Sequence, residues 1–257
     1  DIDDKFETLS KEKIDILKKS WYNKGTMDIY QSIEEKEQII CKEKLEIFEA
    51  FRAFLLEYNQ KYNLTTITEE KDMYYKHFLD SAVGEFLLPK NAKCVEIGSG
   101  AGFPSLPLKL IRDDLQLDLV ESVGKKCDFL RAVVDKFQLS GVHIYNLRAE
   151  DMARDSKFRE KYDIALARAV ARMNTLCEYC LPFVKVGGSF IAYKSGDTSE
   201  IEEAKSAYKI LGARLKEVIS YSLPENYGER TLAVVEKIKP TPPKYPRGQG
   251  KERKQPL

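Results

Sequence analysis

Several features that mark whole classes of protein are scarce or missing in this sequence of 257 residues. No apolar run approaches the ~18 residues that a membrane-spanning helix needs, and the acidic start of the sequence lacks the basic-then-apolar order of a secretory signal peptide. The five cysteines are scattered and odd in number, which favours reduced thiols over a disulfide framework. We therefore expect a cytoplasmic protein without membrane association.

An excess of charge of one sign is also missing. The chain has 42 Lys and Arg residues and 41 Asp and Glu residues, so its formal net charge at pH 7 is +1. The whole molecule therefore offers no bulk attraction to nucleic acid or to a membrane surface, and any such attraction must be local. Hydrophobic residues at 43% and charged residues at 32% are ordinary globular usage, which excludes a wholly disordered, collagen-like or coiled-coil chain.

Common catalytic and metal-binding patterns are rare as well. The only histidines are His77 and His143, and the C-x-x-C pair of Cys177 and Cys180 has no second pair to complete a zinc site. We expect no bound metal. No Ser-His-Asp triad, P-loop or two-carboxylate site stands out. His77 itself is open to two interpretations, a general base or a structural hydrogen-bonding residue.

The chain begins with residues typical of helices. The first forty are charged and helix-prone, and residues 69–88 form a second helical stretch. Between residues 42 and 62, apolar side chains recur at spacings of three and four, as in an amphipathic helix. These side chains are Ile47, Phe48, Phe51, Phe54, Leu55 and Tyr58. We assign residues 1–90 to an N-terminal helical extension.

From residue 91 to residue 238 the pattern is that of an α/β domain. Short β-rich runs alternate with helical ones, which predicts a mostly parallel sheet. The expected strands are 94–97, 115–120, 142–147, 162–167, 189–193, 215–221 and 230–238; the expected helices are 104–111, 124–139, 174–184 and 199–212. No helix separates the last two strands, so they should pair as neighbours, with the final strand antiparallel.

Residues 239–257 form a third region. They contain five prolines, too many for a sheet or a helix, and six basic residues against one acidic residue. This composition predicts a basic, extended C-terminal arm. From composition alone, the arm is as well explained by a solvated tail as by a nucleic-acid contact.

The most informative segment is a glycine loop between a predicted strand and a helix. Glu96, Gly98, Gly100 and Gly102 follow the pattern E-x-G-x-G-x-G, and Phe103 stands where the dinucleotide fingerprint G-x-G-x-x-G has its third glycine. Such a loop lets the backbone approach a nucleotide or nucleoside. This spacing disfavours NAD and is typical of methyltransferases that use S-adenosylmethionine. An isolated glycine cluster can also be a plain tight turn.

Polar residues follow the next strands in the order that a nucleoside site needs. Glu121 ends the second strand, where an acid can accept hydrogen bonds from both ribose hydroxyls. Ala149 and Glu150 follow the third strand, near the expected adenine, and Arg168 follows the fourth. Each residue has a simpler explanation, a helix cap for the acids and an ion pair for Arg168. Their joint order favours the nucleoside site.

Six segments together resemble the RsmG (GidB) family of bacterial 16S rRNA guanine-N7 methyltransferases. They are 63–65 (NLT), 77–81 (HFLDS), 98–107 (GSGAGFPSLP), 148–150 (RAE), 167–171 (ARAVA) and 244–247 (KYPR). The resemblance runs from about residue 45 to the C-terminus; residues 1–40 and 248–254 depart from the family pattern.

The resemblance implies a class I, Rossmann-like methyltransferase fold with a seven-stranded sheet whose last strand is antiparallel. It implies S-adenosylmethionine as cofactor, and methylation of one guanine in the decoding-region loop of 16S rRNA, as free RNA or in the small ribosomal subunit. We expect a monomer. The residues expected to bind the cofactor are Glu96, Gly98, Gly100, Gly102, Phe103, Glu121, Ser122, Val123, Ala149, Glu150 and Arg168.

Arg168 is also the candidate catalytic residue, holding the cofactor or the O6 edge of the guanine in orientation. N7 of guanine carries no proton, so no general base is needed. In the arm, the residues expected to contact RNA are Lys244, Tyr245, Arg247, Lys251, Arg253 and Lys254. The alternatives are a methyltransferase for another RNA or a small molecule, and a non-catalytic nucleotide- or RNA-binding module.

Overall fold

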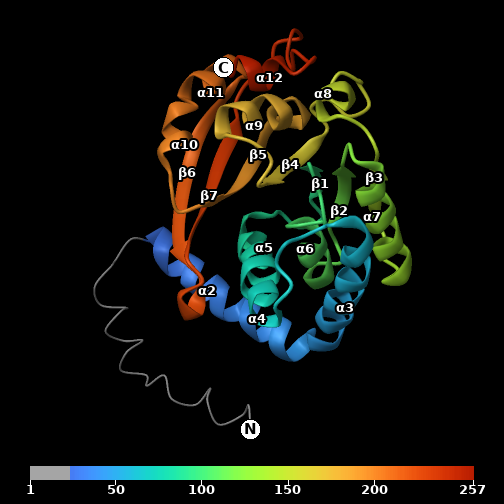
Figure 1. The fold of residues 1–257 in the computed structure, drawn as a ribbon. Coiled ribbons are helices and arrows are strands. Elements are labelled where there is room, and N and C mark those ends of the chain that lie inside the picture. Colours follow the sequence, from blue (N-terminus) through green and yellow to red (C-terminus); the bar gives the residue numbers. More distant parts are fainter. Residues whose placement is uncertain (1–23) are drawn as a thin grey trace.

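The computed structural model describes residues 24–257, and its centre is a seven-stranded sheet (Figure 1). The order of the strands is β3-β2-β1-β4-β5-β7-β6. Their bounds are β1 Lys93–Ile97, β2 Gln116–Val120, β3 Val142–Tyr145, β4 Tyr162–Arg168, β5 Val184–Ser195, β6 Ala213–Ser222 and β7 Glu229–Lys237. The predicted number of strands is confirmed.

The antiparallel pairing of the last two strands is confirmed too. β7 runs antiparallel to both of its neighbours, β5 and β6, while β1 to β5 pair in parallel. β5 is longer than predicted, because it continues through the glycine pair at 187 and 188. A side chain at Gly188 would lie 2.5 Å from the carbonyl oxygen of Asp163, so glycine is what allows the two strands to pass there.

Helices cover both faces of the sheet. Alternate side chains of a strand point to opposite faces; Cys94 thus packs in one hydrophobic core and Val95 in the other. The helices that follow the strands are α6 Ser105–Ile111, α7 Gly124–Lys136, α8 Ala149–Met152, α9 Met173–Cys180, α10 Ser199–Glu203 and α11 Lys205–Ile210. α6 and α7 join the first core, and α8 to α11 join the second.

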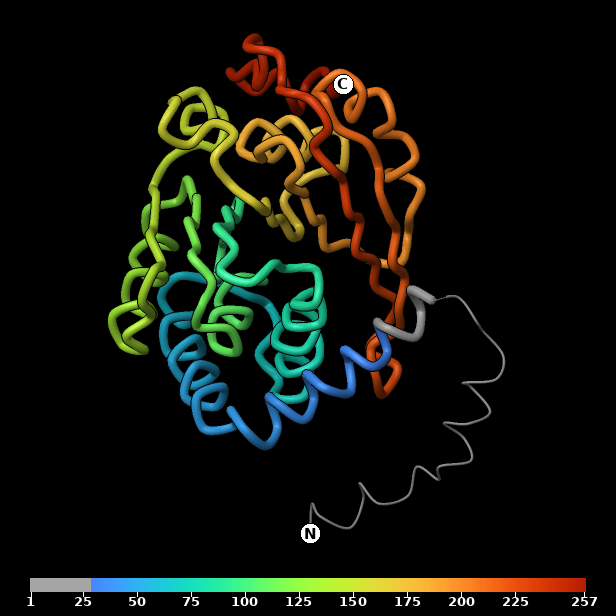
Figure 2. Tube along the Cα trace, turned by 180° about the vertical axis from the view of Figure 1, so that it is seen from behind, coloured from blue at the N-terminus to red at the C-terminus, as the bar shows by residue number. Residues whose placement is uncertain are grey.

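The helical extension packs on the first of these cores. Its elements are α2 Lys24–Gln38, a π-helical turn Ile39–Glu43, α3 Leu45–Tyr62, α4 Glu70–Met73, a second π-helical segment Tyr74–Leu79, α5 Asp80–Val83 and a 3-10 turn Gly84–Leu87. Phe48, Phe51 and Leu55 of the predicted apolar stripe are fully buried. α2 lies beside the end of β6, and α3 lies beside α7 (Figures 1 and 2). The expectations for residues 1–23 fall outside the described residues.

The prediction of an extended C-terminal arm is wrong. The arm folds back over the domain and ends in a short helix, α12 Lys251–Lys254, beside α9 (Figure 1). The guanidinium of Arg159 donates hydrogen bonds to the carbonyls of Thr241, Pro242 and Tyr245, over 2.9–3.3 Å. Prolines exclude long helices and strands, but their carbonyls remain acceptors for a donor on the body of the protein.

Within residues 24–257, no helix combines the length and the apolar character that crossing a bilayer requires.

Candidate active site

The glycine loop lies at the carboxyl end of β1, and its three glycines have different roles. All three have positive φ, between 57° and 86°. A Cβ at Gly98 would lie 2.7 Å from the side chain of Val170, and one at Gly102 would lie 2.2 Å from Leu106. At Gly100, by contrast, the nearest atom to such a Cβ is a backbone oxygen 3.9 Å away. The protein packs tightly against two of the glycines and leaves space at the third.

Glu121, at the end of β2, holds this loop through its carboxylate. One oxygen accepts a hydrogen bond from the backbone N–H of Gly100 (2.9 Å) and the other from that of Val123 (2.8 Å). Each carboxylate oxygen can accept more than one hydrogen bond. Glu121 therefore keeps acceptor capacity on both oxygens at the position predicted for a ribose.

Glu96 lies under the loop, buried at the end of β1. Its Oε2 accepts a hydrogen bond from the backbone N–H of Ser105 (3.0 Å), at the start of α6. Among the described residues, its Oε1 has no partner. Burial raises the pKa of Glu96 to about 7.

The other predicted cofactor residues lie along the same edge of the sheet. Ser122 and Val123 are exposed where β2 leads into α7, and the apolar Val123 side chain is 39% exposed. Ala149 and Glu150 begin α8 and are buried. An exposed apolar side chain close to a carboxylate is suited to the apolar face and polar edge of a nucleoside.

Arg168, the last residue of β4, is held by the helical extension. Its Nη1 donates hydrogen bonds to the carbonyl of Lys76 (3.1 Å) and to Oδ2 of Asp80 (3.2 Å), and its Nη2 lies 2.9 Å from Nδ1 of His77. Asp80 is buried and also accepts a hydrogen bond from the Tyr221 hydroxyl (2.9 Å). Residues from widely separated parts of the sequence therefore meet at this arginine.

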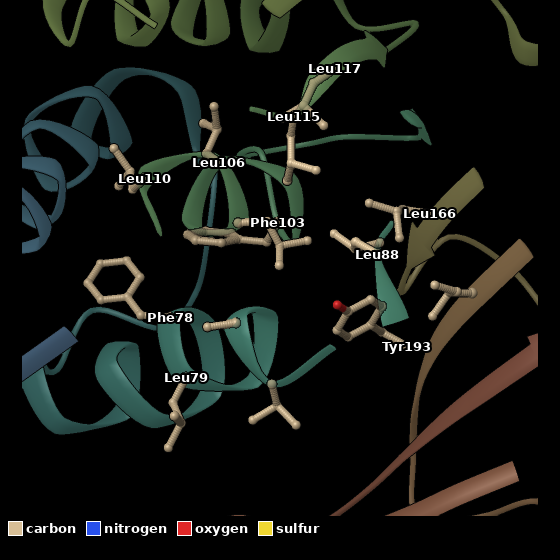
Figure 3. Close-up of a cluster of buried hydrophobic side chains, with 14 of the residues drawn as sticks. Phe78, Leu79, Leu88, Phe103, Leu106, Leu110, Leu115, Leu117, Leu166 and Tyr193 are labelled. Carbon is tan, nitrogen blue, oxygen red and sulfur yellow. The ribbon is translucent and has the colours of Figure 1, made fainter. Parts of the chain in front are cut away.

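Phe103 connects the glycine loop to this network. Its ring stacks on that of His77, with centroids 4.3 Å apart, and the guanidinium carbon of Arg168 lies 5.1 Å from the ring centroid. Figure 3 shows Phe103 in the layer between Phe78 of the extension and Leu106 of α6. The Phe103 side chain is thus a core residue, which leaves mainly its backbone to contact a ligand.

A cavity of about 430 Å³ opens beside Arg168. Its lining includes both signs of charge, and five of its six charged residues come from beyond the glycine loop and β4. The lining residues are Ile67, Lys76, His77, Asp80, Arg168, Ala169, Tyr193, Lys194, Ser195, Glu200 and Arg230. A cavity of this size with several charged groups in its lining, next to the expected nucleoside site, has room for the base of a nucleotide.

The arm brings only part of its predicted RNA-contacting set to the surface. Lys244, Lys251, Arg253 and Lys254 are exposed. Tyr245 is buried, however, which removes its ring as a stacking surface in this conformation. Arg247 is committed to the buried carboxylate of Glu178, with Nη2 2.7 Å from Oε2.

The end of the arm lies at the edge of the sheet that carries the glycine loop and Arg168. Arg253 donates a hydrogen bond from Nη2 to the carbonyl of Val170 (3.2 Å), and the Val170 side chain packs on Gly98. Thr175, near the start of α9, donates a hydrogen bond to the carbonyl of Glu252 (2.9 Å). The exposed cations of α12 therefore lie close to the loop that follows Arg168.

The C-x-x-C pair has a structural role. Cys177 and Cys180 are buried in α9, and burial raises the pKa of both thiols. Across residues 24–257, no group of three or more His, Cys, Asp or Glu side chains could hold a metal ion.

Sequence reasoning missed three residues of the site. Asp80 belongs to the quoted HFLDS segment, yet nothing in the segment indicates that it pairs with Arg168. Lys194 and Arg230 line the cavity from β5 and β7, without any local motif. The only available signal was their position at strand ends, where the carboxyl edge of a parallel sheet collects functional residues.

Comparison with known proteins agrees with this geometry. The sequence model of the GidB family, described as rRNA small subunit methyltransferase G, matches residues 44–229. The chain belongs to this family. The ribosomal RNA small subunit methyltransferase G of Acetivibrio thermocellus is 42% identical over 84% of this chain and 89% of its own. The Streptococcus pneumoniae (strain R6) protein of that name is 42% identical over 89% of this chain and 98% of its own.

A comparison of structures supports the fold. The crystal structure of M. jannaschii TYW2 in complex with AdoMet aligns with a TM-score of 0.51 at 15% identity, covering 67% of this chain and 80% of the other. The GidB-family chain therefore has the predicted class I methyltransferase fold.

Proposed function

We propose that the chain transfers a methyl group from S-adenosylmethionine to N7 of one guanine in the decoding-region loop of 16S rRNA. The observation that carries the proposal is the meeting, at one edge of the sheet, of the Gly100 opening, the Glu121 carboxylate and the cavity beside Arg168. Membership of the GidB family supports the choice of rRNA as substrate.

The residues present fit the cofactor. The space at Gly100 lets a ligand approach the backbone, and Glu121 has acceptor capacity left for ribose hydroxyls. Oε1 of Glu96, which has no partner within residues 24–257, is a buried acceptor that the ammonium group of the cofactor, or a water on it, would satisfy. Ala149, Glu150, Ser122 and Val123 would border the adenine, with Gly98, Gly102 and Phe103 shaping the loop.

The work of this chain is orientation and desolvation. When bound, S-adenosylmethionine supplies a methyl group on a positively charged sulfur. Guanine N7 attacks with a lone pair that carries no proton, so no residue need remove one. Correct alignment of the two reactants is then the main source of rate. Arg168, fixed by three contacts, orients the ligand next to the cavity in which the guanine would lie.

The exposed cations of the arm support RNA binding. Lys244, Lys251, Arg253 and Lys254 are exposed on a segment that ends beside the edge of the sheet with the glycine loop and Arg168. Lys and Arg side chains attract phosphates without regard to sequence, so they would hold the RNA while the cavity selects the base.

The test is transfer of labelled methyl groups to small ribosomal subunits that lack the modification, followed by chemical cleavage specific for N7-methylguanine. We expect label at one guanine of the decoding-region loop. Parallel reactions with free 16S rRNA show which form is the substrate. Label at another atom or RNA, or no label despite cofactor binding by calorimetry, would overturn the proposal.

Glu121→Gln is the matched loss-of-function variant for this test. The amide keeps the size of the side chain but must direct its NH₂ group or its single oxygen at two N–H donors, at Gly100 and Val123. It should weaken cofactor binding and reduce labelling in proportion, by about tenfold or more.

A further inference from the structure

His77 makes polar contacts on both sides of its ring, and one of them is to the arginine of the active site. Nδ1 lies 2.9 Å from Nη2 of Arg168, and Nε2 lies 2.8 Å from Oγ1 of Thr65. The Thr65 backbone N–H is held in turn by Oδ1 of Asn59 (2.9 Å). The ring therefore connects a loop of the helical extension to the end of β4.

These contacts determine the protonation of the ring. A guanidinium has N–H donors and no acceptor, so Nδ1 must accept the hydrogen bond from Arg168 and cannot carry a proton. The proton of the neutral ring is then on Nε2, which donates to Thr65. Both contacts require the same tautomer, and a protonated ring would place N–H against N–H at Arg168.

The surroundings favour the neutral form. Stacking on Phe103 buries the ring, and its charged neighbours are Arg168, which also pairs with Asp80, and Lys76. Burial, followed by the positive charge of Arg168, lowers the pKa of His77 to about 3. A general base near neutral pH would instead need a pKa near 7 and an open route for the proton.

The contacts of Arg168 leave part of its guanidinium for a ligand. Nη1 is used by the Lys76 carbonyl and Asp80, and one Nη2–H by His77. No residue in the described range 24–257 accepts a hydrogen bond from Nε. The Nε–H and the second Nη2–H can serve one carboxylate or one guanine edge.

We propose that His77 is a positioning residue that, through Nδ1, fixes the Arg168 guanidinium so that its remaining N–H groups face the reacting ligands. The inference rests on the proposed function for the identity of those ligands. It also gives the helical extension a part in the active site, because Thr65, His77 and Asp80 all come from it.

The test compares two substitutions that each keep one half of the ring. His77→Asn retains an acceptor near the position of Nδ1, whereas His77→Gln retains a polar group near that of Nε2. We expect His77→Asn to keep kcat within about threefold of the parent, and His77→Gln to lose about tenfold or more. His143→Gln, at the only other histidine, is the matched control and should change neither kcat nor the cofactor Kd.

A double-mutant cycle separates positioning from a general packing defect. Each His77 variant is combined with Arg168→Ala, and both methyl transfer and the Kd of S-adenosylmethionine are measured. If His77 acts through Arg168, His77→Gln should lower kcat about tenfold in the parent and change it hardly at all in the Arg168→Ala background. Equal losses in both backgrounds, for both measurements, would overturn the proposal.

Nitrogen NMR of the histidine rings gives an answer that is independent of activity. With two histidines in the chain, the His143→Gln variant leaves His77 as the only signal. We expect a neutral ring protonated on Nε2. A ring protonated on Nδ1 would overturn the proposal even if methyl transfer is confirmed. If the chain transfers no methyl group, but the His77→Gln effect on the Kd of S-adenosylmethionine disappears in the Arg168→Ala background, only the proposed function is refuted.

Discussion

At the scale of single residues, Glu96 makes stability depend on pH. Burial raises the pKa of its carboxyl group from an ordinary value of 4.5 to about 7. The folded protein therefore holds this proton more tightly than the unfolded chain does, so the free energy of unfolding falls as pH rises from 4.5 to 7. The loss should be on the order of 3 kcal/mol and complete above that range.

Glu96→Gln removes this titration. Urea unfolding of the parent and the variant at pH 5, 6, 7 and 8 should show the variant gaining stability relative to the parent as pH rises, with no further gain above pH 7. Exposed Glu217, changed to Gln, is the control and should follow the parent at every pH. A constant difference between the Glu96 variant and the parent would show that the carboxyl group does not titrate in this range.

At the scale of elements, one ion pair fastens the C-terminal arm to α9. The Glu178 side chain is fully buried and accepts hydrogen bonds from the backbone N–H and the guanidinium of Arg247, at 2.7–3.2 Å. Arg247→Ala leaves a buried carboxylate without its cation, which should cost about 3 kcal/mol in the free energy of unfolding. The exposed cation Lys244, changed to Ala, should cost less than ~0.5 kcal/mol.

The same contacts affect how a truncation would be interpreted. Removal of residues 239–257 would be the direct test of RNA binding if the arm were extended and made no contact with the cofactor loop. Because Arg253 holds the Val170 carbonyl and Val170 packs on Gly98, the truncation would also disturb the cofactor loop. Arg247→Ala with unchanged stability would show instead that the arm is loosely attached and that truncation is a clean test.

Sequence patterns predicted elements better than contacts between them. Apolar runs located all seven strands, and glycine spacing located the loop, because both signals lie within a few neighbouring residues. The partners of Arg168 could not be found in this way. Asp80 lies 88 residues from Arg168 in the sequence, and Tyr221, which donates a hydrogen bond to Asp80, lies 141 residues from Asp80. Local composition also gave a wrong prediction for the arm. Its proline content excludes long helices and strands, but it does not prevent the arm from packing on the domain through Arg159 and Glu178.

At the scale of the whole molecule, a net charge of +1 leaves RNA binding to local clusters. α12 is one such cluster: Lys251 and Lys254 are exposed there, beside the edge that carries the glycine loop, and neither is part of the Arg247 anchor or the Arg253 contact. Replacing both with Ala should therefore weaken RNA binding without loosening the arm.

The salt dependence of binding tests this cluster. Each lost phosphate contact should reduce the slope of log K against log salt by about 0.7–0.9, so the double variant should lose about 1.5. Cofactor affinity and the free energy of unfolding should stay at parental values. Lys216→Ala, an exposed cation on β6, is the control and should leave the slope unchanged. If the double variant kept the parental slope, phosphate contacts would have to come from cations elsewhere along the edge, such as Arg148 after β3, because the bulk charge of the molecule cannot supply them.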